Sequence, residues 1–410
     1  MKCADTLWLV AGLCIAFLTS VARCQAEEAS AEQVNTANSL NYKVDHLLEQ
    51  MTLEEKIGQM TQVDSEALKG HADDVGKYFL GSVLSGGGSD PASGNSPQDW
   101  AKHYDSFQTE ALKTRLKIPM IYGIDAVHGH NNVDGAVIFP HNIGLGASRN
   151  PALVEAAARV TAEEMSGTGI NWAFAPCIAV AQNLRWGRTY ESFGQSPELA
   201  ELLAPAAVRG LQGKNLAGPT SVVACAKHFL GDGGTTNGKD QGNTEIDEAT
   251  LRRIHLPGYI AAIKAGVGSI MVSYNSWNGQ KMHGNKHLLT DVLKGELGFQ
   301  GFLISDWAAI DQLGPNYKDD VEKSINAGLD MVMIPNAPGK PNNYVQFIDD
   351  LKQLVADGKI SQERIDDAVR RILWIKLQTR LFDHPFTDNS LTEQIGSKEH
   401  RAVARQCVQA

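Results

Sequence analysis

The sequence predicts an α/β fold in which eight parallel strands close into a (β/α)8, TIM-like barrel. Eight short apolar runs occur along the chain, segments with helical spacing lie between most of them, and the 410 residues exceed the roughly 250 that such a barrel occupies. Strands that alternate with helices favour parallel pairing. An open doubly wound sheet is the alternative, but no G-x-G-x-x-G turn follows the first strand, which argues against its dinucleotide-binding version.

The predicted strands are short runs of mainly apolar residues, as expected of strands buried on both faces. The first overlaps the end of an amphipathic segment, YKVDHLLEQMTLEEKIGQM. In chain order the strands are Ile57–Val63, Gly81–Ser85, Met120–Gly123, Trp172–Ala175, Val222–Ala226, Ile270–Ser273, Phe302–Ser305 and Met331–Ile334.

Helical spacing is clear in PALVEAAARVTAEEM, ATLRRIHLPGYIAAIKAG and DDVEKSINAG, each of which lies between two of these strands. After the last strand, YVQFIDDLKQLVADGKISQERIDDAVRRILWIKLQTRL predicts two helices joined at DGKIS. The pattern breaks at FDHPFTDNS, and KEHRAVARQCVQA predicts a final helix. These segments complete a barrel expected over residues 40–385.

The amino terminus has the form of a secretory signal. Lys2 precedes a twelve-residue apolar run, Leu7–Leu18, which small residues follow. The run is too short to span a bilayer comfortably, and no later segment reaches the roughly 18–20 apolar residues that a span needs. We therefore expect a signal peptide over residues 1–24 and a secreted or periplasmic protein without a stable membrane anchor. An uncleaved anchor is the alternative, and Asp5 weakens the positive region.

Charge and cysteine content exclude several classes of protein. The formal charge is −10, from 37 basic and 47 acidic residues, and no block of Lys and Arg stands out, so binding to nucleic acid or anionic membranes is not expected. Beyond the signal, Cys177, Cys225 and Cys407 lie far apart. Such spacing is neither a disulfide framework nor a zinc motif, so ordinary packing must hold the core together.

Polar and aromatic side chains follow five of the predicted strands at the point where each strand ends. Because a parallel barrel brings the carboxyl ends of its strands to one rim, these side chains are expected to meet there. They are Asp125 and His128, then Arg185, Arg188 and Glu191, then Lys227, His228 and Asp232, then Tyr274 and Trp277, and finally Asp306 and Trp307.

Each of these residues also has a structural explanation. Asp306 could cap the next helix, Lys227 and His228 could be a surface pair, Trp307 could belong to the core, and Glu191 could pair with an arginine of its own loop. Five consecutive strand ends of mixed charge and aromatic character favour a binding site over these separate explanations.

The chemistry of the predicted rim suits a neutral polyol such as a sugar. Carboxylates and imidazole accept or share hydrogen bonds with hydroxyls, Lys and Arg donate them, and tryptophan offers an apolar face. The glycine-rich stretch Gly86–Pro97 lacks the G-K-[ST] ending of a phosphate loop. His128 and His130 have the spacing of metal ligands without an obvious third and fourth ligand, so we expect no metal and no cofactor, and a metal-dependent barrel hydrolase is only a remote alternative.

Several of these motifs resemble those of the family-three glycoside hydrolases, the β-glucosidases and exo-β-glucanases. The matching stretches are YGIDAVHGHNNVDGAVIFPHNIGLGA, LRWGRTYESFGQSPELA, ACAKHFLGDGGTTNGKDQGNT, MVSYNSWNGQKMHGN and GFLISDW. The resemblance runs from about Asp45 to the last residue. It implies a barrel that cleaves β-linked glucosides with retention, through a covalent glycosyl-enzyme intermediate.

The resemblance also implies roles for individual residues. Asp306 falls on the nucleophile, and Trp307 on a wall against which sugar rings pack. Lys227 and Arg188 are expected to keep the pKa of Asp306 low. The residues that fall on positions holding the non-reducing-end glucosyl unit are Asp125, Arg188, Lys227, His228 and Tyr274.

A retaining mechanism needs a second carboxyl about 5–5.5 Å from the nucleophile. In the related β-glucosidases this acid/base is a glutamate on a second, α/β-sandwich domain, and residues 386–410 resemble the start of the linker to it. The related β-N-acetylglucosaminidases instead carry a His–Asp dyad after a KHFPGHG-type motif, whereas this chain has KHFLGDGG and no matching Asp-Ser-His. We therefore expect a second domain in cis or in trans. The alternative is a truncated chain that binds sugar weakly and is largely inactive.

Overall fold

The computed structural model describes residues 38–410. The predicted signal peptide lies outside this range. Residues 38–49 are helical and form one unit, and a second unit comprises residues 50–410. Everything described below belongs to the second unit.

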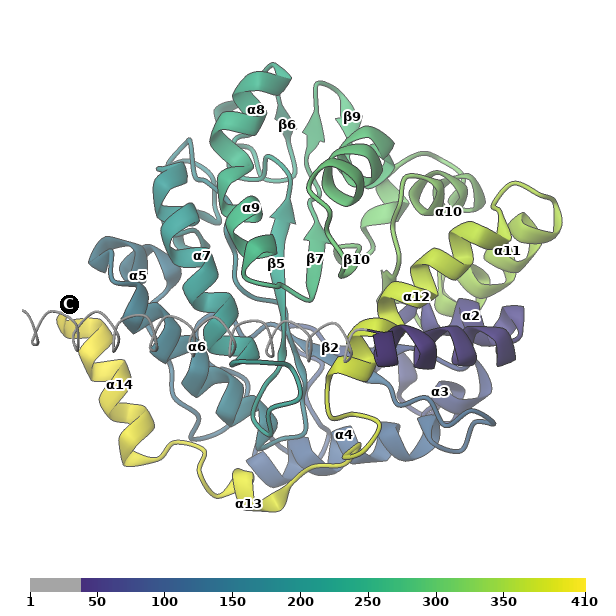
Figure 1. Cartoon of the computed structure of the whole chain (residues 1–410), viewed down its shortest axis with the longest axis horizontal. Coiled ribbons are helices and arrows are strands. Elements are labelled where there is room, and N and C mark those ends of the chain that lie inside the picture. Colours follow the sequence, from purple (N-terminus) through teal and green to yellow (C-terminus); the bar gives the residue numbers. More distant parts are fainter. Residues whose placement is uncertain (1–37) are drawn as a thin grey trace, which may run out of the picture. The chain divides into compact units, whose positions relative to one another are not determined.

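Eight parallel strands form a nearly closed barrel, which confirms the predicted fold (Figure 1). Their order around the barrel is β10-β7-β5-β4-β3-β2-β1-β11. The strands are β1 Thr61–Asp64, β2 Ser82–Ser85, β3 Ile121–Ile124, β4 Trp172–Ala173, β5 Val223–Phe229, β7 Ser269–Val272, β10 Phe302–Ile304 and β11 Val332–Ile334.

The seam of the barrel lies between β10 and β11. The two strands meet through one bridge, between Ile304 and Met331, and Ser305 N donates to Met331 O at 3.0 Å. The buried carboxylate of Asp330 reinforces this seam. It accepts a 2.8 Å hydrogen bond from Leu303 N and pairs with Lys294 Nζ at 2.6 Å, and the Arg364 guanidinium also donates to it.

Helices cover the outside of the strands, and Figure 1 shows α6, α7 and α9 along one side of the barrel. Several begin with a polar cap followed by proline, whose missing N–H costs nothing in the first turn. Asn150 before Pro151 is one example, with its side chain accepting from Ala152 N at 3.1 Å. The helices of this unit are α2 Leu53–Gln59, η1 Ser65–Leu68, α3 Asp74–Lys77, α4 Pro97–Ala111, α5 Asn142–Ser148, α6 Pro151–Ser166, η2 Thr189–Glu191, α7 Pro197–Gln212, η3 Thr236–Gly238, α8 Glu248–His255, α9 Pro257–Lys264, η4 Met282–Gly284, η5 His287–Glu296, η6 Ala309–Gln312, α10 Tyr317–Asn326, α11 Tyr344–Ala356, α12 Gln362–Gln378, α13 Asn389–Thr392 and α14 Lys398–Gln409.

The structure corrects the start of the first strand and divides one helical stretch in two. The strand expected from residue 57 starts at Thr61, because Thr52 and Glu55 form a capping box that begins helix α2 and carries it to Gln59. The stretch with helical spacing over residues 249–266 is helical, as expected, and is divided into α8 and α9. They meet at Leu256, because Pro257 has no N–H to continue the hydrogen-bond ladder.

The amino-terminal end of the barrel is closed by a buried lysine. Lys376, on α12, is fully buried and donates to Gln59 Oε1 and Gly81 O, both at 2.7 Å, and to Pro119 O at 2.8 Å. These acceptors precede β1, β2 and β3, so the ammonium group ties three strand starts to one helix. Three acceptors match the three N–H groups of a charged lysine, whereas burial lowers the pKa of Lys376 to about 7.

The chain after α12 continues along the barrel. Helices α11 and α12 form the predicted pair, and α14 packs against α6. His400 on α14 contacts two carboxylates of α6: Nδ1 lies 2.9 Å from Glu164 Oε1, and Nε2 lies 3.1 Å from Glu163 Oε2. This contact holds the C-terminal helix on the barrel.

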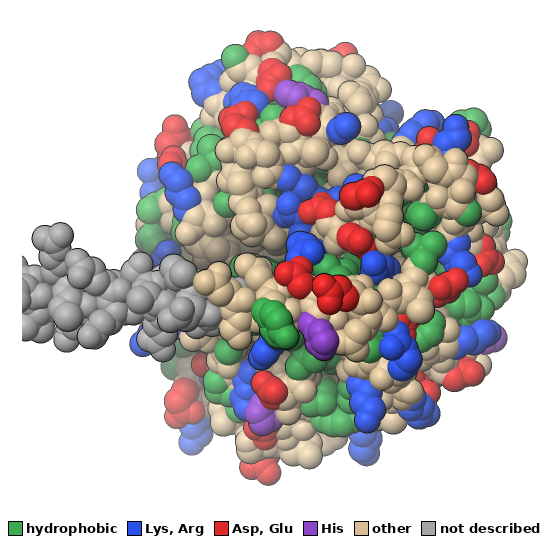
Figure 2. Space-filling model, turned by 45° about the vertical axis from the view of Figure 1, so that its right-hand side comes forward, with side chains coloured by type: hydrophobic (Ala, Val, Ile, Leu, Met, Phe, Trp, Pro, Cys, Tyr) green, Lys and Arg blue, Asp and Glu red, His purple; other side chains and the backbone are tan. Residues whose placement is uncertain are grey.

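The described residues agree with the predictions from composition. Cys177, Cys225 and Cys407 are buried free thiols. Within residues 38–410, no helix is both long and apolar enough to cross a membrane. Figure 2 shows acidic and basic side chains interspersed on one face, in keeping with the mixed charge of the sequence.

Candidate active site

The carboxyl ends of the strands bring together most of the predicted rim residues. Asp125 directly follows β3, and Lys227 and His228 lie near the end of β5. Tyr274 comes two residues after β7, and Asp306 comes two residues after β10. Arg188 reaches the same cluster from the long loop after β4, where it precedes η2.

Asp306 lies at the centre of this cluster and is 8% exposed. Its Oδ1 accepts from Trp307 N at 2.8 Å, and its own N–H donates to His283 Nε2 at 3.1 Å. Its Oδ2 is buried and has no hydrogen-bond partner among the described residues. The explanation of Asp306 as a helix cap is wrong, because η6 begins after Ala308 without a side-chain cap.

The pKa of Asp306 lies above its ordinary value. Burial raises it, and this effect exceeds the lowering by His228, by the Trp307 N–H, and by Arg188 and Lys227. The prediction that the basic neighbours keep this pKa low is therefore wrong in its net direction, although both cations act as expected.

Lys227 and Asp125 form an ion pair on the wall of the site. Lys227 Nζ donates to Asp125 Oδ1 at 2.6 Å; the lysine side chain is buried, whereas 52% of the aspartate side chain is exposed. Burial alone would lower the pKa of Lys227, but Asp125 and Glu191 raise it above its usual value, so the lysine is charged. Since Lys227 and His228 are both buried, the explanation of this sequence pair as a surface feature is wrong.

Arg188 is held by Glu191 through two hydrogen bonds, of 2.7 Å from Nε and 3.1 Å from Nη2. This confirms that Glu191 pairs with an arginine of its own loop. Such bidentate pairing fixes the plane of the guanidinium. Nη2 of Arg188 also lies 3.0 Å from His228 Nε2. The same Nε2 atom of His228 lies 3.7 Å from Asp306 Oδ2.

Two aromatic residues complete the cluster. The Tyr274 hydroxyl donates to Trp307 O, and burial, with the charge of Asp306, raises the pKa of Tyr274. Trp307 is 39% exposed, so it is not a core residue. It offers a partly open indole face beside the carboxylate.

Other predicted rim residues have different roles. Trp277 Nε1 donates to Ile246 O at 2.8 Å within a small sheet of β6 Asn243–Thr244, β8 Ser276–Trp277 and β9 Gln280–Lys281. Arg185 is exposed. His128 packs on His141, with ring centroids 4.4 Å apart.

The possible metal pair is not assembled into a metal site. His130 is fully buried, and its Nε2 lies 2.9 Å from Thr168 Oγ1. Across residues 38–410, no group of three or more His, Cys, Asp or Glu side chains is arranged to hold a metal ion.

Two residues of the site were not assigned a role from the sequence. His283, on η4, accepts from the backbone of Asp306; it lies in the matching stretch MVSYNSWNGQKMHGN, but no role was assigned to it. Asp232 was placed at the rim without a function; its Oδ2 lies 2.8 Å from His228 Nδ1, and both residues are buried. The spacing of four residues between them was the available signal.

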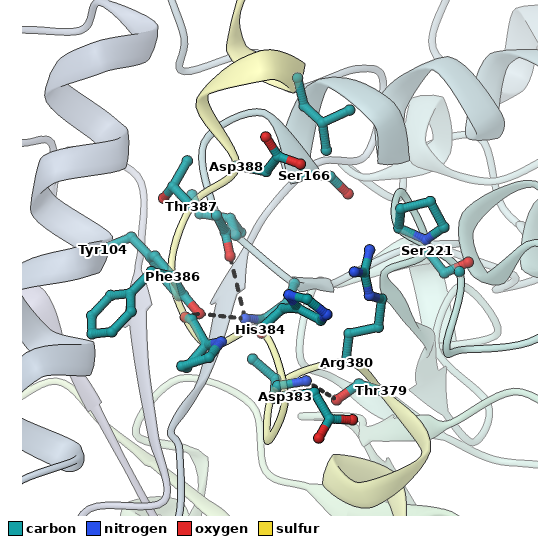
Figure 3. A pocket seen from close by; sticks show the side chains of 18 residues that line it. Tyr104, Ser166, Ser221, Thr379, Arg380, Asp383, His384, Phe386, Thr387 and Asp388 are labelled. Atoms are coloured by element: carbon teal, nitrogen blue, oxygen red, sulfur yellow. Dashed lines mark hydrogen bonds between the residues drawn. The ribbon is translucent and has the colours of Figure 1, made fainter.

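A cavity of about 440 Å³ lies away from this cluster. Its walls include residues that precede β4 and β5, so it opens at the amino ends of the strands. Figure 3 shows Tyr104, Arg380, His384 and Phe386 around it. In a parallel barrel the chemistry belongs to the opposite, carboxyl-terminal rim, and the candidate active site is therefore the cluster around Asp306.

Comparisons with known proteins agree with this geometry. Residues 52–375 match the family described as Glycosyl hydrolase family 3 N terminal domain. The chain is 35% identical to a lysosomal beta glucosidase of Dictyostelium discoideum, over 92% of this chain and 49% of the relative. It is 32% identical to a periplasmic beta-glucosidase of Salmonella typhimurium, over 89% of this chain and 47% of the relative.

Solved structures give the same result. The exo-1,3/1,4-beta-glucanase ExoP from a Pseudoalteromonas species superposes with a TM-score of 0.84 and 41% identity, over 90% of this chain and 47% of that one. A beta-glucosidase from Listeria innocua in complex with glucose gives a TM-score of 0.78 and 31% identity, over 90% and 51%. The chain thus spans about half the length of these relatives. With the family match over most of its length and an eight-stranded parallel barrel, this chain belongs to glycosyl hydrolase family 3.

Proposed function

We propose that this chain is the catalytic barrel of a β-glucosidase or exo-β-glucanase that releases glucose from the non-reducing end of β-linked glucosides. The observation that carries the proposal is the unpartnered Oδ2 of Asp306, buried within reach of the cationic groups of Lys227 and Arg188. The names of the relatives support the substrate class.

In the proposed mechanism, Asp306 attacks the anomeric carbon and the aglycone leaves, giving a covalent glycosyl-enzyme that water then hydrolyses with net retention. The Lys227–Asp125 pair and the Arg188–Glu191 pair present rigid donors and acceptors to sugar hydroxyls. His228 and Tyr274 bind on the side of the nucleophile, and Trp307 packs against a ring face. Fixed polar groups of this kind contribute most when they are already oriented before the substrate binds.

The acid/base that protonates the leaving group is proposed to come from a second domain, in cis or in trans. Residues 386–410 would lead toward that domain. We also propose that residues 1–24 direct export, so that the protein is secreted or periplasmic without a stable membrane anchor. The periplasmic relative supports this location.

The test of Asp306 uses the barrel together with a second domain and an aryl β-glucoside. Asp306→Ala should lower turnover by roughly 10³-fold or more, because nucleophile and acid/base act as a unit. A slow 2-fluoroglucoside should label the wild-type peptide that carries Asp306. Asp311→Asn, which changes an aspartate five residues away that bonds Asn342, is the control and should retain turnover. Unchanged turnover in Asp306→Ala rules out the assignment.

The alternative is that the 410 residues alone bind sugar weakly and hydrolyse little. Comparing two substrates distinguishes it from the proposed function. Protonation of the leaving group by an acid speeds hydrolysis by about 10²–10⁴-fold. Without the acid, the rate of cellobiose hydrolysis should therefore fall far more than the rate for an activated aryl glucoside. Rapid cleavage of cellobiose by the 410-residue chain alone would exclude this alternative and would place the acid/base within the barrel.

A further inference from the structure

The two ring nitrogens of His228 face different groups. Nε2 lies 3.0 Å from Arg188 Nη2 and 3.7 Å from Asp306 Oδ2. Nδ1 lies 2.8 Å from Asp232 Oδ2. His228 and Asp232 are only 2% and 5% exposed, so water does not compete strongly for either nitrogen.

Arg188 determines which of the two nitrogens carries a proton. A guanidinium has donors and no acceptor, so Nε2 of His228 must face Arg188 with its lone pair. Burial, followed by the charge of Arg188, lowers the pKa of His228 to about 3, and the ring is neutral. Its single proton is then on Nδ1, and the nearest acceptor is Oδ2 of the Asp232 carboxylate at 2.8 Å, although the two atoms are not aligned as a hydrogen bond.

We propose that Asp232 is a positioning residue that holds His228 in the tautomer with its proton on Nδ1. The meaning of this arrangement for catalysis rests on the proposed function. With a lone pair on Nε2, His228 cannot donate a hydrogen bond to Asp306, and Oδ2 of Asp306 is left free to attack. With the proton on Nε2 instead, the ring would oppose an Arg188 donor at 3.0 Å and would offer a proton toward the nucleophile.

Close packing of the loop that carries Asp232 restricts the position of its side chain. Asp232 lies in the glycine-rich loop after β5, where a Cβ at Gly233 would come within 2.8 Å of Val180 O, and one at Gly234 within 2.5 Å of His255 Nε2. Close backbone packing of this kind leaves the Asp232 side chain little freedom to turn away from the ring.

The tautomer can be observed without turnover. The 410-residue chain, labelled with ¹⁵N-histidine, would be studied by long-range ¹⁵N–¹H correlation at pH 7.5, and the signal of His228 among the 12 histidines identified by its loss in His228→Gln. The wild-type ring should show the pattern of a neutral imidazole protonated on Nδ1. Asp232→Asn should keep this pattern, because its amide oxygen still accepts. Asp232→Ala should lose it, with the Nε2–H form appearing.

The control is Asp240→Asn, an aspartate of the same loop that accepts from Trp186 Nε1 at 3.3 Å; it should leave the His228 pattern unchanged. An Nε2–H pattern in the wild-type chain overturns the proposal even if the Asp232 variants do not fold. Retention of the Nδ1–H pattern in a folded Asp232→Ala also overturns it. Because the spectrum requires no catalysis, failure of the proposed glycosidase activity would appear only in the Asp306→Ala assay.

Discussion

Gly86 and Trp307 are in direct contact, and the contact leaves no room for a side chain at position 86. A Cβ built on Gly86 would lie 2.5 Å from Cζ3 of the Trp307 indole. Gly86 follows β2, and its N–H donates to the buried Asp64 carboxylate at 3.1 Å. The backbone at position 86 is tied to Asp64, so a side chain added there would meet the indole.

Gly86→Ala should displace Trp307 and weaken sugar binding. Because Trp307 is 39% exposed, its ring can turn outward, so the free energy of unfolding should fall by less than the roughly 1–3 kcal/mol that overpacking of a core costs. Titration calorimetry with glucose should show a weaker affinity than for the wild-type chain. Gly87→Ala is the matched control, because a Cβ there meets no atom within 4 Å. Equal affinities in the two variants would mean that Trp307 does not contact the sugar.

Lys376→Met should destabilise the barrel without altering the rim. The methionine fills similar volume but leaves Gln59 Oε1 and the Pro119 carbonyl without the donor they have now. Buried acceptors without partners should lower the free energy of unfolding by about 2–4 kcal/mol. Urea unfolding measures this change. The control is Lys352→Met, which removes only a surface pair with Glu54 and should change stability by less than about 1 kcal/mol.

Asp232 should make the stability of the fold depend on pH. Burial raises the pKa of Asp232 to about 6, with Arg188 and His255 lowering it and Glu191 raising it. In the unfolded chain the value is about 3.9. The folded chain thus binds the proton more tightly, and its free energy of unfolding falls as the pH rises from about 4 to 6.

Asp232→Asn cannot ionise and should escape this loss. The quantity to compare is the free energy of unfolding of the variant minus that of the wild-type chain. This difference should be larger at pH 7.5 than at pH 4 by on the order of 2–3 kcal/mol. Urea unfolding at the two pH values gives the difference directly. An advantage of the same size at both pH values would show that Asp232 ionises as easily in the folded chain as in the unfolded one.

His400→Ala should loosen α14 while leaving the barrel intact. The imidazole contacts Glu163 and Glu164 of α6, and Glu164 is fully buried. Hydrogen exchange of the α14 amides should accelerate, with the exchange of α6 changing less. Arg405→Ala, on the exposed side of α14, serves as the control. Unchanged exchange in His400→Ala would show that apolar packing alone holds the helix.

Much of the fold is predictable from the sequence, because strands buried on both faces are rich in apolar residues, even where polar residues such as Gln62 and Lys227 are buried with them. All eight strands are found in this way. The differences occur where local chemistry overrides the pattern, as with the capping box at Thr52 and the proline at 257. The strands β6, β8 and β9 are two residues long, too short to show any period.

The sequence predicts which residues form the candidate site, but not which of them contact one another. The rule that strand ends meet at one rim selects Asp125, Lys227, His228 and Asp306. It does not reveal that His283 accepts from the backbone of Asp306, because this contact depends on how a separate loop folds back. The direction of the Asp306 pKa shift was missed for a similar reason, since it depends on the balance of burial and charge in three dimensions.

The position of Asp306 relative to the barrel seam has a mechanical consequence. Asp306 follows β10, which meets β11 through a single bridge and a few backbone hydrogen bonds, together with the side chains around Asp330. The proposed nucleophile therefore lies beside the seam of the barrel, which we expect to open first on heating or in denaturant. Warming should erode the geometry around Asp306 before the other seven strands part, so catalytic competence and global unfolding would have separate midpoints.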